Sequence, residues 1–205
     1  MSLPATVVLA TGNPGKVAEF NALLSDFGTL VRPQSYWAVP EAAETGTTFV
    51  ENAIIKARNA CAHTGLPAIA DDSGMEIPAL DGEPGVYSAR WAGPDANDGQ
   101  NNAHLIDALL DLSSNERLAY YRCVLVYLRH AADPAPLIAE GVWQGEVIET
   151  ASGTDGFGYD PHFFLAEHQC TAAALDPAIK NRCSHRGKAL RDLRQALEQE
   201  WTSHA

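Results

Sequence analysis

The alternation of short apolar runs with helical stripes is the feature that most constrains how this chain can fold. Residues 6–10 (TVVLA) are β-branched and apolar, which is typical of a buried strand. The turn-forming residues 11–15 follow, and apolar side chains then recur at helical spacing from Val17 to Leu24. We therefore expect the chain to open with a strand, a glycine-rich turn and a helix.

A second helix and strand follow the same plan. Thr48 and Glu51 have the spacing of a capping box, with Thr48 as the N-cap, and they predict a helix that ends near His63. The apolar run 68–70 predicts the next strand, which we expect to stop at the acidic turn 71–74 (DDSG).

The second half of the chain indicates a hairpin. Residues 122–129 and 137–148 predict two strands around a proline-containing turn, and a glycine-rich loop follows at 152–160. The final helix is predicted by an apolar stripe made of Leu190, Leu193, Leu197 and Trp201. These elements predict an α/β fold with a mixed β-sheet, and we expect residues 1–205 to form a single domain.

Composition narrows the classes of function. The 205 residues are 46% hydrophobic, which is enough for a packed core, and the net charge is −12. A nucleic acid would be repelled by this charge, so we expect no nucleic-acid partner. Neither a signal peptide nor an apolar run long enough to span a membrane is evident, so we expect no membrane partner and a cytoplasmic location.

The first candidate site is the turn from Thr11 to Lys16 (TGNPGK). It lies between a strand and the start of a helix, where backbone N–H groups and the helix dipole favour an anion, and Lys16 adds a full positive charge. The spacing differs from that of a Walker A loop, because Val17 stands where a magnesium-binding Ser or Thr would be. An ordinary turn with a surface lysine is the alternative.

The second candidate site is acidic. Asp71 and Asp72 directly follow a predicted strand. Adjacent carboxylates can bind a hard cation, or one can act as a base while the other tunes its pKa. Adjacent strand residues point to opposite faces, so one of the two suffices for a site. Glu44 is a further oxygen ligand, and Asn52 and Lys56 share one helix face. The alternative is a solvated turn beside a capped helix.

The third candidate site combines the glycine-rich loop with basic residues near the last helix. Phe157 and Tyr159 could stack on a base, and His185 and Arg186 could donate hydrogen bonds to its carbonyl edge. Aromatic side chains that enter the core, and a helix start capped by Ser184, are the alternatives. The chain has four lysines, and the placement of three of them in these segments favours a site for a triphosphate.

Together these segments resemble the inosine/xanthosine triphosphate pyrophosphatase family, the RdgB-type house-cleaning nucleotide hydrolases. The resemblance rests on six segments in the family's order: TGNPGK (11–16), ETGTTFVENAIIKA (44–57), AIADDSGMEI (68–77), PGVYSARWAG (84–93), GTDGFGYDPHFF (153–164) and KNRCSHRGKAL (180–190). It implies an elongated mixed sheet in two lobes with a central substrate cleft, a homodimer, and Mg²⁺-dependent hydrolysis of ITP, dITP and XTP between the α- and β-phosphates.

The resemblance also implies roles for individual residues. Asp72 would be the proton acceptor and, with Glu44, a metal ligand. The substrate would be bound by Thr11, Gly12, Asn13, Pro14, Gly15, Lys16, Lys56, Ser73, Phe157, Gly158, Tyr159, Asp160, Lys180, His185 and Arg186.

Three rival classes remain for comparison. A pyrophosphatase for modified pyrimidine nucleotides would carry Ser-Pro-Arg-Arg after the first strand, where this chain has Gly-Asn-Pro-Gly-Lys. A non-catalytic nucleotide sensor could lose the acids, yet Glu44, Asp71 and Asp72 are all present. The net charge argues against a nucleic-acid-binding module.

Overall fold

The computed structural model describes residues 4–11, 16–17, 20–21, 24–110, 112–113 and 116–202. The chain divides into two compact units. Unit 1 comprises Met1–Asp72, Cys123–Glu140 and Ala189–Ala205, and unit 2 comprises Ser73–Arg122 and Gly141–Lys188. The single domain over residues 1–205 stays a prediction.

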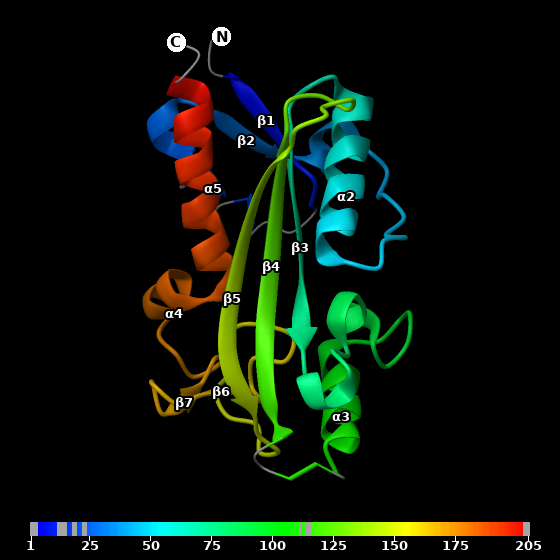
Figure 1. Ribbon diagram of the computed structural model, residues 1–205, viewed down its shortest axis with the longest axis vertical. Coiled ribbons are helices and arrows are strands. Elements are labelled where there is room, and N and C mark those ends of the chain that lie inside the picture. The colour runs from blue at the N-terminus through cyan, green and yellow to red at the C-terminus, as the bar shows by residue number, and fades with distance from the viewer. Residues whose placement is uncertain are drawn as a thin grey trace. The chain divides into compact units, whose positions relative to one another are not determined.

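Seven strands of the described chain form one mixed sheet, in the order β2-β1-β3-β4-β5-β6-β7 (Figure 1). Strand β1 pairs in parallel with β2 and β3, whereas β6 pairs antiparallel with β5 and β7. The strands are β1 (Thr6–Leu9), β2 (Leu30–Pro33), β3 (Ala68–Glu76), β4 (Leu118–Leu128), β5 (Leu137–Val147), β6 (Phe163–Leu165) and β7 (Cys170–Thr171). The predicted α/β fold with a mixed sheet is confirmed.

Four α-helices with described bounds accompany the sheet. They are α2 (Phe49–Thr64), α3 (Asp98–Ala108), α4 (Pro177–Cys183) and α5 (His185–Thr202). Lys16, Val17, Phe20, Asn21 and Leu24 are also helical, as the opening pattern predicts. Short 3₁₀ turns are η1 (Ser25–Phe27), η2 (Gln34–Trp37), η3 (Pro78–Leu80) and η4 (Gly85–Arg90). Among the described residues, none of the helices combines the length and apolar character of a membrane span.

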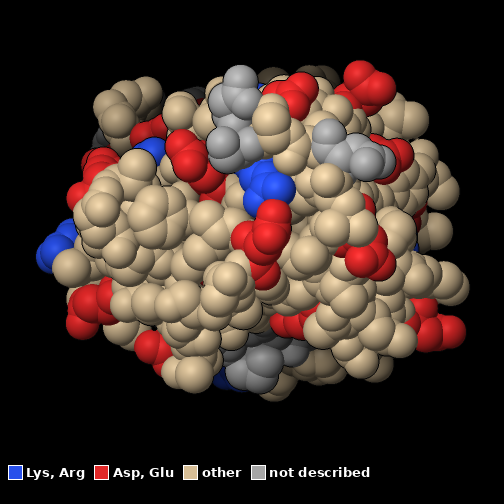
Figure 2. Space-filling view, turned by 90° about the horizontal axis from the view of Figure 1, so that it is seen from below, with Lys and Arg blue, Asp and Glu red and all other residues tan. Residues whose placement is uncertain are grey.

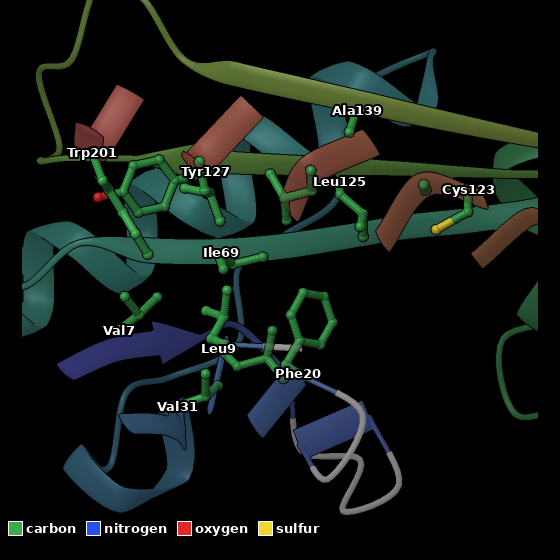
Figure 3. Close-up of a cluster of buried hydrophobic side chains, with 14 residues drawn as sticks. Val7, Leu9, Phe20, Val31, Ile69, Cys123, Leu125, Tyr127, Ala139 and Trp201 are labelled. Atoms are coloured by element: carbon green, nitrogen blue, oxygen red, sulfur yellow. The ribbon is translucent and has the colours of Figure 1, made fainter. Parts of the chain in front are cut away.

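The core of unit 1 lies between the sheet and α5. Figure 3 shows side chains from the strands, among them Leu9, Ile69 and Leu125, turned toward a common apolar cluster that includes Trp201. The predicted stripe of the last helix supplies the remaining wall, because Leu193 and Leu197 are fully buried in the same cluster. In Figure 1, α2 lies on the opposite side of these strands from α5.

Helix α2 begins and ends as the sequence predicts. The Thr48 side chain accepts a hydrogen bond from the Glu51 N–H, the Glu51 carboxylate accepts one from the Thr48 N–H, and Gly65 ends the helix in the left-handed conformation. Ala53, Ala57 and Ala60 form its fully buried face. These small side chains let the helix backbone approach the strands closely.

The prediction that the strand beginning at residue 68 stops at the acidic turn 71–74 is wrong. Strand β3 continues through Asp71 and Asp72 to Glu76, so the two acids lie inside a strand and are 4% and 9% exposed. Turn-forming residue types ordinarily end a strand. Here lysine side chains satisfy both carboxylates within unit 1, which removes the need to expose them to water.

The core of unit 2 is rich in aromatic side chains. Tyr121, Trp143 and Phe163 pack with Met75 and Leu105 in one buried cluster. Residues 78–97, which precede α3, contain η3, η4 and turns. Acidic side chains are scattered over the face shown in Figure 2, in keeping with the net charge of −12.

Strands β4 and β5 are neighbours in the sheet, as the predicted hairpin requires. Their connection is fixed by Asp133, which is 1% exposed and receives hydrogen bonds from the Arg129 guanidinium at 2.6 and 2.8 Å. The side-chain hydrogen bonds from Arg129 hold the pKa of Asp133 well below its usual range, against the opposing effect of burial.

We expect Thr48→Ala to destabilise the protein by about 1 kcal/mol, because α2 would lose its N-cap hydrogen bonds. Urea unfolding would measure the difference, with Thr45→Ala as the control, since Thr45 is an exposed threonine before the helix. An equal effect of the two substitutions would contradict this role of the cap.

We expect Asp133→Asn to lower the free energy of unfolding at neutral pH. A depressed carboxyl pKa stabilises the fold above the unfolded-state pKa, and this contribution is lost as the pH falls through the folded-state pKa. The difference from wild type should therefore shrink in acid. Urea unfolding from pH 7 to pH 3 tests this, with the exposed Asp192→Asn as the control; a pH-independent difference would contradict it.

Candidate active site

Strand β3 places two acids side by side in the chain, with different partners. Asp71 Oδ2 accepts a hydrogen bond from Lys16 Nζ at 2.6 Å, and Asp72 Oδ1 accepts one from Lys56 Nζ at 2.7 Å. Neighbouring strand residues point in opposite directions, which explains why the two carboxylates meet different lysines. Ser73, the next residue of the strand, is partly buried.

Glu44 joins this cluster through Lys56. The Lys56 ammonium also donates to Glu44 Oε1 at 2.9 Å, so one cation bridges two carboxylates from separate segments of unit 1. Asn52, one helical turn before Lys56, directs Nδ2 at Asp72 Oδ2 over 3.4 Å. The predicted shared face of Asn52 and Lys56 is confirmed, and it faces the acids.

The surroundings of this cluster shift the proton affinity of two of its members. Burial raises the pKa of Asp72, and the negative charge of Glu44 adds to the rise, while Lys56 opposes it. Burial works against the charged form of Lys56, but the carboxylates, Asp72 foremost, outweigh it and raise the Lys56 pKa overall. Lys56 is therefore a firmly charged ammonium, whereas Asp72 has an increased affinity for a proton.

The donor set suits a hard divalent cation. Glu44 and Asp72 both reach the Lys56 ammonium, so their oxygens already converge on one positive charge. Across the described residues, no group of three or more His, Cys, Asp or Glu side chains is arranged to hold a metal ion. Magnesium is commonly bound by one or two carboxylates, with substrate phosphates and water as the other ligands, and Glu44 and Asp72 fit that pattern.

The backbone of Gly46 lies close to the Asn52 side chain and fixes its orientation. The Gly46 N–H donates to Asn52 Oδ1 at 2.8 Å, and Asn52 is fully buried. A Cβ atom at position 46 would lie 2.8 Å from the same oxygen and 2.6 Å from the Glu51 Cβ, so glycine is required there. The amide of Asn52 thus ties the segment that carries Glu44 to Asp72.

The predicted phosphate-binding turn is described at its two ends. Thr11 follows β1 and is partly buried, and Lys16 stands in the helical segment after the turn. Gly12, Asn13, Pro14 and Gly15 lie outside the described residues, and their predicted contacts stay predictions.

In unit 2, Asp160 organises the glycine-rich loop. Its Oδ2 accepts hydrogen bonds from the Phe157 N–H at 2.9 Å and from Lys180 Nζ at 2.6 Å. Gly156 has φ 85°, and a Cβ there would lie 2.2 Å from Asp160 Oδ2 and 2.6 Å from Lys180 Nζ. The loop can therefore close on Lys180 because residue 156 is a glycine.

The two aromatic side chains of this loop differ in their exposure to solvent. Phe157 is 57% exposed, and Lys180 Nζ and Arg186 Cζ lie 5.8 and 5.4 Å from its ring centre. Tyr159 is 3% exposed and donates from its hydroxyl to the Ser88 carbonyl. The prediction that the Tyr159 side chain stacks on a base is therefore wrong, because that side chain belongs to the core of unit 2.

Sequence reasoning missed the part that α3 plays. Asp98 Oδ2 accepts a hydrogen bond from the Gly158 N–H at 2.6 Å, and Asn102 Nδ2 donates to the Gly158 carbonyl at 2.9 Å. The start of α3 thereby clamps the glycine-rich loop at one residue. The capping box formed by Asn97 and Gln100 was the available sequence signal, because it fixes where this helix begins.

Aromatic rings hold His185 in place. The Tyr121 ring stacks on the His185 imidazole with centroids 4.7 Å apart and planes 10° apart, and Trp143 lies 6.3 Å away at 25°. The Ser184 hydroxyl accepts from the Gly187 N–H, so the predicted cap of the last helix is also present. Capping and base recognition are compatible roles for this segment.

Known proteins match nearly the whole length of this chain. The model of the Ham1 family matches residues 7–196. The chain is 58% identical to a dITP/XTP pyrophosphatase of Thioalkalivibrio sulfidiphilus, over 94% of this chain and 98% of that protein. It is 55% identical to a dITP/XTP pyrophosphatase of Vibrio cholerae, over 96% and 98% of the two chains.

A solved structure supports the same assignment. The HAM1 protein from Coxiella burnetii superposes with a TM-score of 0.91 at 48% identity, over 95% of this chain and 98% of that one. These full-length similarities show that the chain belongs to the Ham1 family.

Proposed function

We propose that this protein is a magnesium-dependent hydrolase that converts ITP, dITP and XTP to the nucleoside monophosphate and pyrophosphate. It would thereby remove deaminated purines from the nucleotide pool. The observation that carries the proposal is the convergence of Glu44 and Asp72 on one cation inside unit 1. The full-length similarity to proteins named dITP/XTP pyrophosphatases supports the reaction class.

The residues of unit 1 suit the triphosphate. Lys16 and Lys56 supply positive charge, and Thr11 begins the turn whose N–H groups we propose as further phosphate ligands. Glu44 and Asp72 would hold magnesium. When bound there, the metal would neutralise charge that develops on the leaving pyrophosphate.

Asp72 is our candidate for the general base. Its carboxylate is largely buried and held in place by side chains of unit 1, and a positioned carboxylate of this kind can accept the proton of an attacking water. Asn52 contacts Asp72 Oδ2 and helps to fix the orientation of the carboxylate. Ser73 follows in the same strand, and we propose it as a substrate contact.

The residues of unit 2 suit the base. Phe157 offers an exposed ring for stacking, and Lys180, His185 and Arg186 offer donors. Hypoxanthine and xanthine present a carbonyl where adenine presents an amino group. Donors aimed at that position favour the carbonyl and are left unpaired by adenine, which disfavours ATP. Gly158 and Asp160, and Tyr159 through its backbone, complete the proposed loop contacts.

We further propose that the chain acts as a homodimer in the cytoplasm, as the family resemblance implies. A non-catalytic nucleotide sensor is the alternative function. It would need the basic residues but not the acids, whereas Glu44, Asp71 and Asp72 are all paired with lysines in unit 1. That arrangement favours the enzyme.

We expect Asp72→Asn to slow pyrophosphate release from ITP by roughly 10²–10⁴-fold, the usual contribution of a general base. The substitution keeps the size of the side chain and removes the carboxylate. Asp71→Asn is the matched comparison, because Asp71 contacts Lys16 rather than Lys56. Circular dichroism would verify folding, and near-wild-type turnover of folded Asp72→Asn would refute the assignment.

We expect Arg186→Ala to reduce the preference for ITP over ATP, in kcat/KM, by about tenfold or more, since a lost donor to a substrate carbonyl costs roughly 1–3 kcal/mol. Arg182→Ala is the control, because Arg182 is exposed at the end of α4. Pyrophosphate release from both nucleotides gives the ratio. An unchanged ratio would show that Arg186 does not read the base.

A further inference from the structure

Lys56 occupies the place that the proposed metal would need. Its ammonium contacts Asp72 Oδ1 at 2.7 Å and Glu44 Oε1 at 2.9 Å, and these are the two residues proposed as metal ligands. The three side chains are 16%, 11% and 26% exposed, so this is a largely buried bridge. A lysine placed there for phosphates alone would not need to contact both carboxylates.

The remaining oxygen of Asp72 has a different neighbour. Oδ2 faces the Asn52 amide at 3.4 Å, and Asn52 is itself fixed by the Gly46 N–H at 2.8 Å. Oδ1 is therefore the Asp72 oxygen turned toward a cation, and Lys56 holds it. Any divalent ion that bridges Glu44 and Asp72 at this place competes with the ammonium.

Charge makes the competition strong. A dication beside an ammonium is repelled, and the repulsion grows where burial lowers the effective dielectric constant. The flexible four-carbon side chain of lysine lets the ammonium move away from the two carboxylates to a new anion.

We propose that Lys56 is the resident counter-ion of Glu44 and Asp72, that it leaves them when a divalent cation binds, and that the triphosphate then accepts it. The inference rests on the metal ligands of the proposed function. Two carboxylates balance one dication, so the displaced ammonium needs new negative charge, which the phosphates supply. Metal binding without nucleotide is therefore weak, and each of the two ligands promotes binding of the other.

A purely structural bridge makes the opposite prediction. If Lys56 served to hold Glu44 and Asp72 together for the metal, removing it would loosen the site and weaken metal binding. If Lys56 competes with the metal for the two carboxylates, removing Lys56 strengthens metal binding and impairs turnover. The two roles thus differ in the sign of one measurable change.

The test is isothermal titration calorimetry with Mg²⁺ in the absence of nucleotide. We expect Lys56→Met to bind the metal about tenfold more tightly than wild type, or better, because the repelling charge is gone. Lys56→Arg, which keeps the charge, should stay close to wild type. Adding Glu44→Gln to Lys56→Met should abolish the gain, which places the metal at these carboxylates.

Equal or weaker binding by folded Lys56→Met would overturn the proposal, as would the absence of metal binding in both proteins. A second measurement covers the case in which Lys56→Met does not fold. The chain has four lysines, so the ammonium NMR signals of the wild type can be assigned. Saturating Mg²⁺ should shift the Lys56 signal and leave that of Lys188, which donates to the Val142 carbonyl, unchanged. An unmoved Lys56 signal would refute the displacement.

The metal-binding test of Lys56 and the hydrolysis test of the proposed function can succeed or fail independently. Metal affinity is measured without nucleotide, so a protein that hydrolyses no ITP can still show tighter binding in Lys56→Met. Conversely, rapid ITP hydrolysis by wild type with no gain in metal affinity for Lys56→Met would leave the proposed function standing and remove this inference.

Discussion

The burial of two adjacent carboxylates inside strand β3 is the constraint on which the architecture of unit 1 depends. Asp71 and Asp72 are 4% and 9% exposed, and a charge so far from water is costly unless an opposite charge meets it. Lys16 and Lys56 meet these charges from two different helical segments. The helices flanking the strand must therefore sit where their lysines reach the acids, and packing alone would not demand this.

Helix α2 shows how local sequence rules serve that constraint. The capping box of Thr48 and Glu51 sets where the helix begins, and hence which face Asn52 and Lys56 present. Because Gly46 has no side chain, the Asn52 amide can lie against the backbone there and accept a hydrogen bond from the Gly46 N–H. This contact holds the segment that carries Glu44 close to Asn52. One cation, the Lys56 ammonium, then pairs with two acids, and we propose that this arrangement changes when a metal and a triphosphate bind.

In unit 2, contacts with neighbouring side chains fix the positions of the polar donors. Asp160 closes the glycine-rich loop on Lys180, and α3 clamps the same loop at Gly158. Tyr121 fixes the plane of the His185 ring by stacking on it. Rigid donors discriminate between a carbonyl and an amino group better than mobile ones, because an unmatched donor cannot turn away to find another partner. We propose that ion pairing in unit 1 serves the phosphates and that ring stacking in unit 2 serves recognition of the base.

The sequence by itself predicted the class of fold and the main helices and strands. Periodicity predicted the mixed sheet, the capping signals predicted α2 and the start of α5, and the placement of the few lysines led us to expect an anion site beside them. These features are local, so residue type and spacing suffice to predict them. The tertiary structure decided what depends on distant partners. It extended β3 through Asp71 and Asp72 because lysines far away in the chain neutralise them, and it sent Tyr159 into the core while leaving Phe157 exposed. It also revealed α3 as the clamp of the loop and Lys56 as the cation between Glu44 and Asp72, because such pairings arise only when separate segments meet.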